Sequence, residues 1–465
     1  MDKKNINITV FGAGISGLAT AFWLNEQGFE ITVLESKKEP GGSMVTRHED
    51  GFLIDYGPNS GLETTPLIGQ IVERVGLKGE MIYALEKANK RYILRNNQLH
   101  ALPTHPVAFI KTKLFSPKAK LRLLAEPFSR KSYEGYYQSI SEFVKRRLGQ
   151  EFLDYAVNPF VAGIFAGNPD NLSVKSALPK LYRLEEVYGG LFKGFVLGAK
   201  ERKKRAEQSK QSARMFSFIK GMQSFPAAIA AKLSGKVRYN CKVESVVKSG
   251  SKFKVFYSQG DTTEEIVTDI VLSTVPAYHA ASIFKGWGNQ LVNHLSTIYY
   301  PPVCVLYLGF RKEVVGQILD GFGFLIPEKE NKTFLGAIWN SAIFSYRAKD
   351  DMTAFTLFVG GARSPELLDN RNNEHINRVI KEFKEIMNID EDPVIIKEKM
   401  WPKAIPQYSL GYIEHERYFE EFESNNPGIF LSGNYRGGIS VGDCVKNSEL
   451  ICKRICEYIN RTAIG

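Results

Sequence analysis

The sequence predicts an α/β fold with three parts: a parallel-sheet domain, a mixed α+β domain and an inserted helical domain. Three patterns lead to this prediction. A strand, a glycine-rich turn, a helix and a second strand follow one another over residues 10–35. Residues 143–197 have no strand-like periodicity and indicate helices, whereas residues 285–405 alternate strand and helix patterns. With 465 residues, 43% of them hydrophobic and 24% charged, the chain is an ordinary globular sequence too long for one hydrophobic core.

The first turn has the spacing of a dinucleotide-binding site in a Rossmann-like domain. It consists of Gly12, Ala13, Gly14, Ile15, Ser16 and Gly17. Gly12 permits the tight turn, Gly14 lets the backbone approach a pyrophosphate, and Gly17 allows close packing of helix on strand. Glu35, at the end of the second strand, stands about 20 residues downstream, where a ribose hydroxyl needs an acceptor. An ordinary β–α turn would not require that acid, so the sequence predicts an adenine dinucleotide.

The parallel-sheet domain is expected to be discontinuous. Strand patterns return at residues 237–240, 243–247 and 269–275, and the last of them is stopped by Pro276. The predicted boundaries are 1–80, 212–283 and 407–465 for the dinucleotide-binding domain, 81–211 for a mainly helical domain with part of the substrate domain, and 284–406 for the substrate-binding domain.

Further motifs resemble the FAD-binding amine oxidase and protoporphyrinogen oxidase superfamily. They are Pro40-Gly41-Gly42-Ser43, residues 52–60, residues 433–438 and Val441-Gly442-Asp443. Residues 160–167 and Gly321-Phe322-Gly323 are more particular, and they are similar to oxygen-dependent protoporphyrinogen oxidases. This resemblance extends over nearly the whole chain.

The resemblance implies non-covalent FAD, because no cysteine lies where covalent-flavin amine oxidases attach theirs. Asp443 departs from the family, which often has a basic residue there, so its carboxylate could instead cap the last helix. Ser43 replaces an arginine that many amine oxidases carry. The residues expected to contact FAD are Gly12, Ala13, Gly14, Ile15, Ser16, Gly17, Glu35, Ser36, Gly41, Gly42, Ser43, Gly57, Pro58, Asn59, Val243 (through its backbone), Trp401, Gly433, Val441, Gly442 and Asp443.

A porphyrinogen is an apolar macrocycle with carboxylates at its edge, so its pocket needs apolar walls and a cationic anchor. By resemblance, the substrate-binding residues are Arg91, Gly163, Phe322, Leu325, Ile338 and Phe358. Arg91 would hold a propionate, although by itself it would be an ordinary surface arginine. Phe322 and Leu325 are three residues apart and would face opposite sides of a regular strand, so a bend near Gly321 or Gly323 is required.

The activity that the resemblance implies is oxidation of protoporphyrinogen IX to protoporphyrin IX in haem biosynthesis. It would proceed by three hydride transfers from carbon to FAD, each followed by reoxidation with O2 to give H2O2. No side-chain base is expected, because the proposed substrate motifs contain no histidine or carboxylate. Three alternatives stay open: oxidation of coproporphyrinogen III, an FAD amine or carotenoid oxidase, and a flavin-binding scaffold without turnover.

Charge and cysteine usage set the remaining expectations. The net charge of +11 suits anionic lipid, nucleic acid or acidic ligands, but no nucleic-acid module is recognisable. Residues 106–131 interleave apolar and basic side chains, which indicates either an interfacial membrane segment or a helix with a solvated basic face. The protein is therefore expected in the cytoplasm, peripheral on the inner face of the cell membrane. The five cysteines form no CxxC pair and no metal cluster is expected; a homodimer and a neighbouring haem-pathway enzyme stay open as partners.

Overall fold

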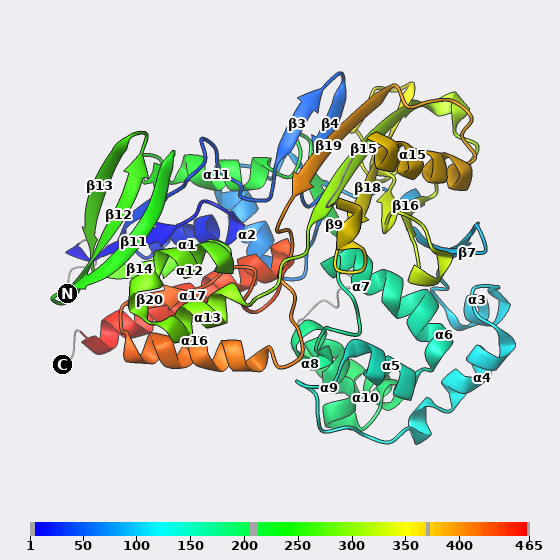
Figure 1. The fold of residues 1–465 in the computed structure, drawn as a ribbon, viewed down its shortest axis with the longest axis horizontal. Coiled ribbons are helices and arrows are strands. Elements are labelled where there is room, and N and C mark those ends of the chain that lie inside the picture. Colours follow the sequence, from blue (N-terminus) through cyan, green and yellow to red (C-terminus); the bar gives the residue numbers. More distant parts are fainter. Residues whose placement is uncertain (1–4, 205–212, 369–372, 463–465) are drawn as a thin grey trace.

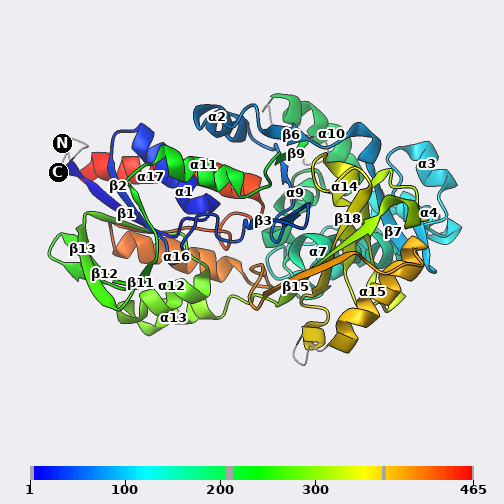
Figure 2. The same cartoon turned by 90° about the horizontal axis from the view of Figure 1, so that it is seen from above.

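The computed structural model describes residues 5–204, 213–368 and 373–462. Figure 1 shows an elongated molecule with two lobes, and both chain termini lie at the outer end of one of them. Figure 2 shows the same separation from above. Each lobe is built on its own sheet, and the predicted ligand-binding residues come from both lobes.

Within the described residues, the first lobe is built on a sheet of strand order β10-β2-β1-β14-β20. Every pairing in this sheet is parallel. Parallel strands end at the same edge, so Gly12, Glu35 and Gly433, which follow β1, β2 and β20, lie along one edge. The strands are β1 (Asn7–Phe11), β2 (Glu30–Leu34), β10 (Val237–Arg238), β14 (Ile270–Ser273) and β20 (Ile429–Leu431).

Helices and a second sheet bury both faces of this parallel sheet. One face packs against α1 (Ile15–Glu26), α2 (Pro66–Arg74), α11 (Ser224–Lys232) and α17 (Val441–Thr462). The other packs against α12 (Ala277–Ile283), α13 (Asn289–Ser296), α16 (Ile413–Asn425) and the antiparallel strands β11 (Cys241–Ser249), β12 (Lys252–Gln259) and β13 (Thr262–Thr268). Residues of α17 that include Cys452 and Cys456 lie on one face of the helix and pack into the first core.

The second lobe contains a mixed sheet, with strand order β19-β15-β18-β17-β16-β7-β8 in the described chain. Only β16 and β7 pair in parallel among its described strands. One face is buried by α15 (Asn373–Met387), whose Phe383 is fully buried against it. The strands are β7 (Lys90–Arg95), β8 (Gln98–Ala101), β15 (Val303–Arg311), β16 (Gly321–Leu325), β17 (Gly336–Ile338), β18 (Met352–Gly360) and β19 (Ile395–Trp401).

From the end of β8 to residue 204, the described chain is mainly helical (Figure 1). Its elements are α3 (Pro106–Lys111), α4 (Pro117–Leu124), η3 (Glu126–Phe128), α5 (Ile140–Arg147), α6 (Gln150–Phe152), the π-helix η4 (Leu153–Val157), α7 (Asn158–Phe165), α8 (Val174–Ala177), α9 (Pro179–Tyr188) and α10 (Leu191–Lys204).

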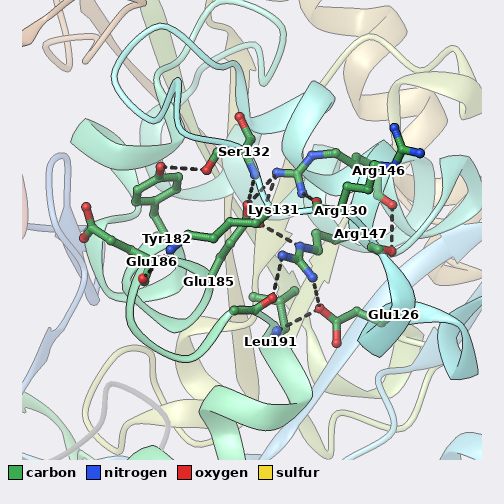
Figure 3. A network of polar contacts seen from close by, with 12 residues as sticks. Glu126, Arg130, Lys131, Ser132, Arg146, Arg147, Tyr182, Glu185, Glu186 and Leu191 are labelled. Carbon is green, nitrogen blue, oxygen red and sulfur yellow. Dashed lines mark hydrogen bonds and ion pairs between the residues drawn. The ribbon is translucent and has the colours of Figure 1, made fainter.

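A buried ion network ties several of these helices together (Figure 3). Arg147, on α5, bonds Glu126 of η3 at 3.0 Å and Glu185 of α9 at 2.7 Å, and all three side chains are fully buried. Glu126 also accepts the backbone N–H groups of Leu191 and Phe192 at the start of α10. Removing one partner would leave a buried charge unpaired, so these four elements are expected to behave as one unit.

Short elements complete the chain and join the lobes. The strands β5 (Gly61–Leu62), β9 (Met215–Phe218) and β6 (Met81–Tyr83) form a small antiparallel sheet, and β3 (Thr46–Glu49) pairs with β4 (Phe52–Asp55). The other short helices are η2 (Glu86–Ala88), η5 (Lys285–Trp287), η6 (Lys312–Val314), η7 (Glu328–Glu330), α14 (Asn340–Ile343) and η8 (Pro365–Leu368).

Candidate flavin and substrate site

The glycine turn has the geometry that its sequence predicts. Gly12 has φ +94°, a conformation that favours glycine, and its N–H bonds the carbonyl of Leu34 at 2.8 Å. A Cβ on Gly17 would lie 2.1 Å from the Gly12 carbonyl oxygen, so α1 could not begin this close to the turn with a larger residue. Gly14 is half-buried, a Cβ on it would meet only Gly42 Cα at 4.0 Å, and it forms an isolated bridge with Gly41. Backbone at Gly14 is therefore accessible to a ligand phosphate.

Glu35 fastens the turn to the end of β2. Its carboxylate is almost completely buried, with 5% of the residue exposed. Oε2 accepts the N–H of Ala13 at 2.6 Å, and Oε1 accepts the N–H of Lys37 at 2.9 Å and the hydroxyl of Ser36 at 3.2 Å. A carboxylate offers about four lone-pair sites, so Oε2 keeps one for a ribose hydroxyl.

The second glycine pair lies against the first turn. The N–H of Gly41 bonds the Ala13 carbonyl at 2.9 Å, and Gly42 comes so close to Gly14 that a Cβ on Gly42 would lie 3.2 Å from its Cα. Both glycines have positive φ, +127° and +63°. Lys37 donates to the Gly42 carbonyl at 3.0 Å. The two turns thus form one cradle of backbone with a cation beside it, which fits a dinucleotide pyrophosphate.

The segment Gly57-Pro58-Asn59 joins this cradle to the mixed sheet. Gly57 packs so tightly that a Cβ would lie 1.9 Å from the Ser43 carbonyl oxygen. The Asn59 side chain donates to the Gly57 carbonyl at 3.1 Å and accepts from Asn340 at 2.6 Å and Thr356 at 3.3 Å. A buried amide network therefore fixes this predicted flavin-contact segment relative to β18.

Trp401 and Val243 lie close to different parts of the cradle, Trp401 beside Lys37 and Val243 on the strand that passes Glu35. The Trp401 indole N–H donates to the Tyr56 carbonyl at 2.8 Å, and Lys37 Nζ lies 5.7 Å from the centre of its ring. Val243 is half-buried on β11, just before a bulge, and this strand passes Glu35 through the bond of the Cys241 N–H to the Glu35 carbonyl at 2.8 Å. Both residues thus border the predicted cofactor position.

The C-terminal segment returns to the same edge of the parallel sheet. Gly433 has φ +129° directly after β20. The Tyr408 hydroxyl donates to the Asn434 carbonyl at 2.9 Å and accepts the N–H of Gly438 at 2.8 Å, and burial raises the pKa of this tyrosine. Gly442 packs against β5 and the residues after it, because a Cβ there would lie 3.1 Å from the Leu62 carbonyl oxygen and 2.6 Å from Thr64 Oγ1. Neutral Tyr408 therefore holds the C-terminal loop in place through its hydrogen bonds to Asn434 and Gly438.

Asp443 forms a cap on the last helix. Its Oδ2 accepts the Ser440 hydroxyl at 2.6 Å, and its N–H bonds Ser440 Oγ at 3.1 Å, which is a reciprocal capping arrangement. The alternative considered from sequence, that this acid caps the helix, is thus confirmed, and the assignment of its carboxylate to the cofactor has no support in these contacts. Val441 is buried in the core beside α1.

The predicted substrate residues gather on one face of the mixed sheet. Strand register aligns Phe358, Gly336, Leu325 and Ile93 in one cross-strand row, and Thr356, Ile338, Gly323 and Arg91 in the next. Aligned residues, and residues two apart along a strand, project from the same face. Leu325, Ile338, Phe358 and Arg91 therefore share the face opposite α15.

Exposure shows that these positions border an open space. In β16, only Phe322 and Leu325 are half-exposed, in β17 only Ile338, and in β18 only Phe358 and the terminal Met352. Their neighbours along the strands are buried. Apolar side chains inside a sheet are normally buried, so this pattern marks a partly exposed apolar surface formed by the predicted residues.

The bend that Phe322 and Leu325 require is present as a β-bulge. The register with β7 shifts between Gly321 and Gly323, so Phe322 is the extra residue. Gly323 has φ +138°, and a Cβ there would lie 2.0 Å from the Ala337 carbonyl oxygen. The bulge turns the Phe322 ring toward Arg91, whose guanidinium carbon lies 5.7 Å from the ring centre. Partial burial lowers the pKa of Arg91, which still remains a cation at neutral pH.

Helix α7 contributes a second apolar surface. Gly163 touches Leu325, because a Cβ on it would lie 2.6 Å from Leu325 Cδ2. Phe160 and Ile164, three residues before and one after this glycine, are 45% and 41% exposed. Phe160 and Ile164 are four residues apart and therefore share one helix face. This stripe and the sheet face form the two walls of a candidate substrate site.

Comparison with known proteins decides the family. The family model described as flavin containing amine oxidoreductase matches residues 15–456. The chain belongs to this family. It is an oxidoreductase with FAD as its cofactor. The cradle of Gly12, Gly14, Gly41 and Gly42 fits that cofactor.

Proteins similar to this flavin oxidoreductase align with almost its whole length. Protoporphyrinogen oxidase 2, chloroplastic/mitochondrial, of Arabidopsis thaliana is 32% identical over 97% of this chain and 94% of its own length. Coproporphyrinogen III oxidase of Bacillus subtilis (strain 168) is 27% identical over 99% of this chain and 100% of its own. A crystal structure of a candidate protoporphyrinogen oxidase from Exiguobacterium sp. 255-15 has a TM-score of 0.80 at 21% identity and covers 97% of this chain and 98% of its own. That likeness supports the mixed α/β fold of this flavin oxidoreductase.

Sequence analysis missed several residues of the flavin oxidoreductase site. Gln223 accepts the Thr46 N–H at 2.9 Å and donates to the Pro40 carbonyl at 3.0 Å, which braces the second glycine pair. Lys37 and Thr356 were missed as well. Gln223 and Thr356 give no signal in the sequence, because each contacts a segment that only folding brings near it, whereas Lys37 contacts Gly42 only five residues along the chain. Phe160 and Ile164 belong to a recognised motif but were not assigned to the site.

Neither a metal site nor a membrane-spanning helix is found in the described residues. Among residues 5–204, 213–368 and 373–462, no three His, Cys, Asp or Glu side chains converge in a way that could hold a metal ion. No helix in the same ranges is long and apolar enough to span a bilayer.

Proposed function

We propose that this protein oxidises protoporphyrinogen IX to protoporphyrin IX in haem biosynthesis, with O2 as the electron acceptor. The observation that carries the proposal is the convergence of Arg91 with four half-exposed apolar side chains on one sheet face, opposite α7. The names of its relatives support the same chemistry. FAD, held by the cradle of Gly12, Gly14, Gly41 and Gly42, would supply the acceptor for hydride from carbon, with O2 as the final oxidant and H2O2 as its product.

The residues of the site bind and orient the substrate. Arg91 pairs with a propionate at the macrocycle edge, which a planar guanidinium can hold with two hydrogen bonds. Phe322, Leu325, Ile338 and Phe358 exclude water from the macrocycle face. No side chain needs to act as a base, because pyrrole N–H groups can release the protons.

Coproporphyrinogen III is the second candidate, since it differs by propionates in place of two vinyl groups and would need more cations. One basic neighbour of Arg91 is already neutralised, because Arg95, on the same sheet face, pairs with Glu151 at 2.7 Å. This favours the substrate with fewer carboxylates.

The test is porphyrin fluorescence produced by the purified holoenzyme in air from each porphyrinogen, with no-enzyme controls for autoxidation and parallel measurement of H2O2. A higher kcat/KM for protoporphyrinogen IX supports the proposal, and a higher value for coproporphyrinogen III replaces it with the second candidate. If neither substrate reduces the flavin anaerobically, a porphyrinogen oxidase is excluded. Amine substrates would then be tested, and a protein inactive with them too would be a scaffold.

We also propose a peripheral membrane contact through the α3–α4 surface, defined here by the exposed apolar residues Val107, Ile110, Leu121, Leu124 and Phe128. They are 56% to 88% exposed. The exposed cations Lys111, Lys113 and Lys118 accompany them, a combination that suits an anionic lipid surface. Leu114 and Phe115, expected from sequence to belong to this interfacial set, are instead buried against Ile93.

The membrane proposal is tested by flotation with vesicles of phosphatidylcholine, with and without phosphatidylserine. The double variant Ile110→Asp/Leu121→Asp is expected to lose most of the vesicle-bound fraction. Val267→Asp, at a 45% exposed position on β13 in the other lobe, is the matched control. Equal binding by both variants would refute the proposed surface.

A further inference from the structure

Asp320 links the two residues that flank Arg91. Its Oδ1 accepts the hydroxyl of Tyr92 at 2.6 Å, and its Oδ2 accepts the ammonium of Lys90 at 2.5 Å. These residues stand directly before and after Arg91 on β7. Partial burial would raise the pKa of Asp320, but hydrogen bonds from Lys90 and Tyr92 outweigh it and hold the pKa below its ordinary value. The carboxylate is therefore ionised at neutral pH.

The contacts of Asp320 lie on the side of the strand away from the candidate site. Successive side chains of a strand alternate between its faces, so Lys90 and Tyr92 project opposite to Arg91. Tyr92 packs with Trp339, with ring centres 5.5 Å apart, as part of the core covered by α15. Asp320 thus contacts no proposed substrate wall and can act only through the strands that it joins.

Asp320 also precedes the bulge that aims Phe322. Gly321 pairs with Lys90 and Gly323 with Arg91, which leaves Phe322 without a partner in register. A Cβ on Gly321 would lie 2.7 Å from the Lys90 carbonyl oxygen and 2.9 Å from the Tyr92 ring, so the two strands are in very close contact here. A carboxylate that holds β7 at two points opposes a slip of this short parallel pairing, which no hairpin fixes.

We propose that Asp320 is a positioning residue for substrate binding: it locks β7 onto β16 so that Arg91 and Phe322 meet on the opposite face. The proposal rests on the proposed porphyrinogen oxidase function. Without Asp320, Arg91 keeps its charge but loses its fixed direction, so the affinity for the carboxylate substrate falls. The hydride-transfer step from bound substrate is unaffected, because the contacts of Asp320 are remote from the reacting carbon.

The first experiment compares the holoenzyme with Asp320→Ala and Tyr92→Phe. Asp320→Ala is expected to raise KM for protoporphyrinogen IX three- to tenfold with kcat changed less than twofold. Tyr92→Phe removes one of the two bonds and is expected to give a two- to threefold increase. The dissociation constant for protoporphyrin IX, followed by its Soret band, should rise in parallel and needs no turnover. Asp392→Ala is the matched control, since Asp392 pairs with Lys384 at 2.7 Å and its side chain is 90% exposed.

A double-mutant cycle separates positioning from general destabilisation. In an Arg91→Ala background, Asp320→Ala should change KM less than twofold, because the residue that it positions is gone. The same KM increase in both backgrounds, or a fall in kcat with unchanged KM, would overturn the positioning role. If wild type oxidises and binds no porphyrinogen, the proposed function fails and this proposal fails with it. A wild type that is active while the cycle is additive refutes the positioning role alone.

Discussion

Replacement of Glu35 by glutamine tests how the cofactor cradle is held together. The carboxylate accepts two backbone N–H groups through different oxygens, Ala13 at 2.6 Å and Lys37 at 2.9 Å. A glutamine side chain has one oxygen and one NH2 group. Whichever way the amide turns, its NH2 meets one of these backbone N–H donors. Glu35→Gln therefore cannot preserve the arrangement, although its shape is almost the same.

The cost follows from burial. One charge-assisted bond becomes a neutral bond and the other becomes a buried donor facing a donor, which together cost about 2 to 4 kcal/mol. No discount for solvent applies, because Glu35 is 5% exposed. The unfolding free energy should fall by this amount. Loss of the ribose acceptor should also weaken FAD binding by about 10- to 100-fold, since about 1.4 kcal/mol corresponds to a factor of ten.

FAD release is followed by the rise in flavin fluorescence during dialysis or urea titration, and stability by circular dichroism. Glu30→Gln is the matched control on the same strand, because Glu30 is exposed and forms only a 3.4 Å pair with Lys236. It should change stability by less than about 0.5 kcal/mol. If Glu35→Gln kept FAD within twofold of wild type and matched Glu30→Gln in stability, the role assigned to the carboxylate would be refuted.

Three further predictions concern other parts of the molecule. Arg91→Ala should raise KM for the porphyrinogen about 5- to 30-fold in steady-state assays with kcat changed less than threefold, because it removes an exposed cation whose pairing with a substrate carboxylate contributes about 1 to 2 kcal/mol. Gly323→Ala should lower the unfolding free energy by more than about 2 kcal/mol in urea titrations, because φ is +138° and the Cβ would lie 2.0 Å from the Ala337 carbonyl oxygen. Burial lowers the pKa of His294 and of His415 in the folded protein, so the unfolded chain binds more protons. The unfolding free energy should therefore fall as the pH drops below about 6.5. Urea titrations at several pH values should show a weaker pH dependence when both are replaced by asparagine, and an unchanged dependence would contradict this.

The cofactor cradle was largely predictable because its determinants are local. Gly12, Gly17 and Glu35 belong to one β–α–β segment, and their roles depend on backbone geometry within that segment. Gln223 was not predictable in the same way. It braces Pro40 from 183 residues away, and nothing near it in sequence marks it as part of a cofactor site.

The substrate face shows a different limit. The need for a bend beside Phe322 followed from strand periodicity alone, and the bulge confirms it. Its partner strand could not be foreseen, because β7 and β16 lie more than two hundred residues apart and pair in parallel. The contacts of Asp320 with Lys90 and Tyr92 depend entirely on that pairing.

By itself, the sequence determined the dinucleotide turn, the acid that supports it and the bend beside Phe322. These follow from backbone restrictions at glycine, from strand alternation and from residue spacing, which are properties of short segments. The tertiary structure decided which side chains share a sheet face. Register between strands distant in sequence set Arg91, Leu325, Ile338 and Phe358 on one face, and a shift of one residue would have turned each side chain of a strand to the other face.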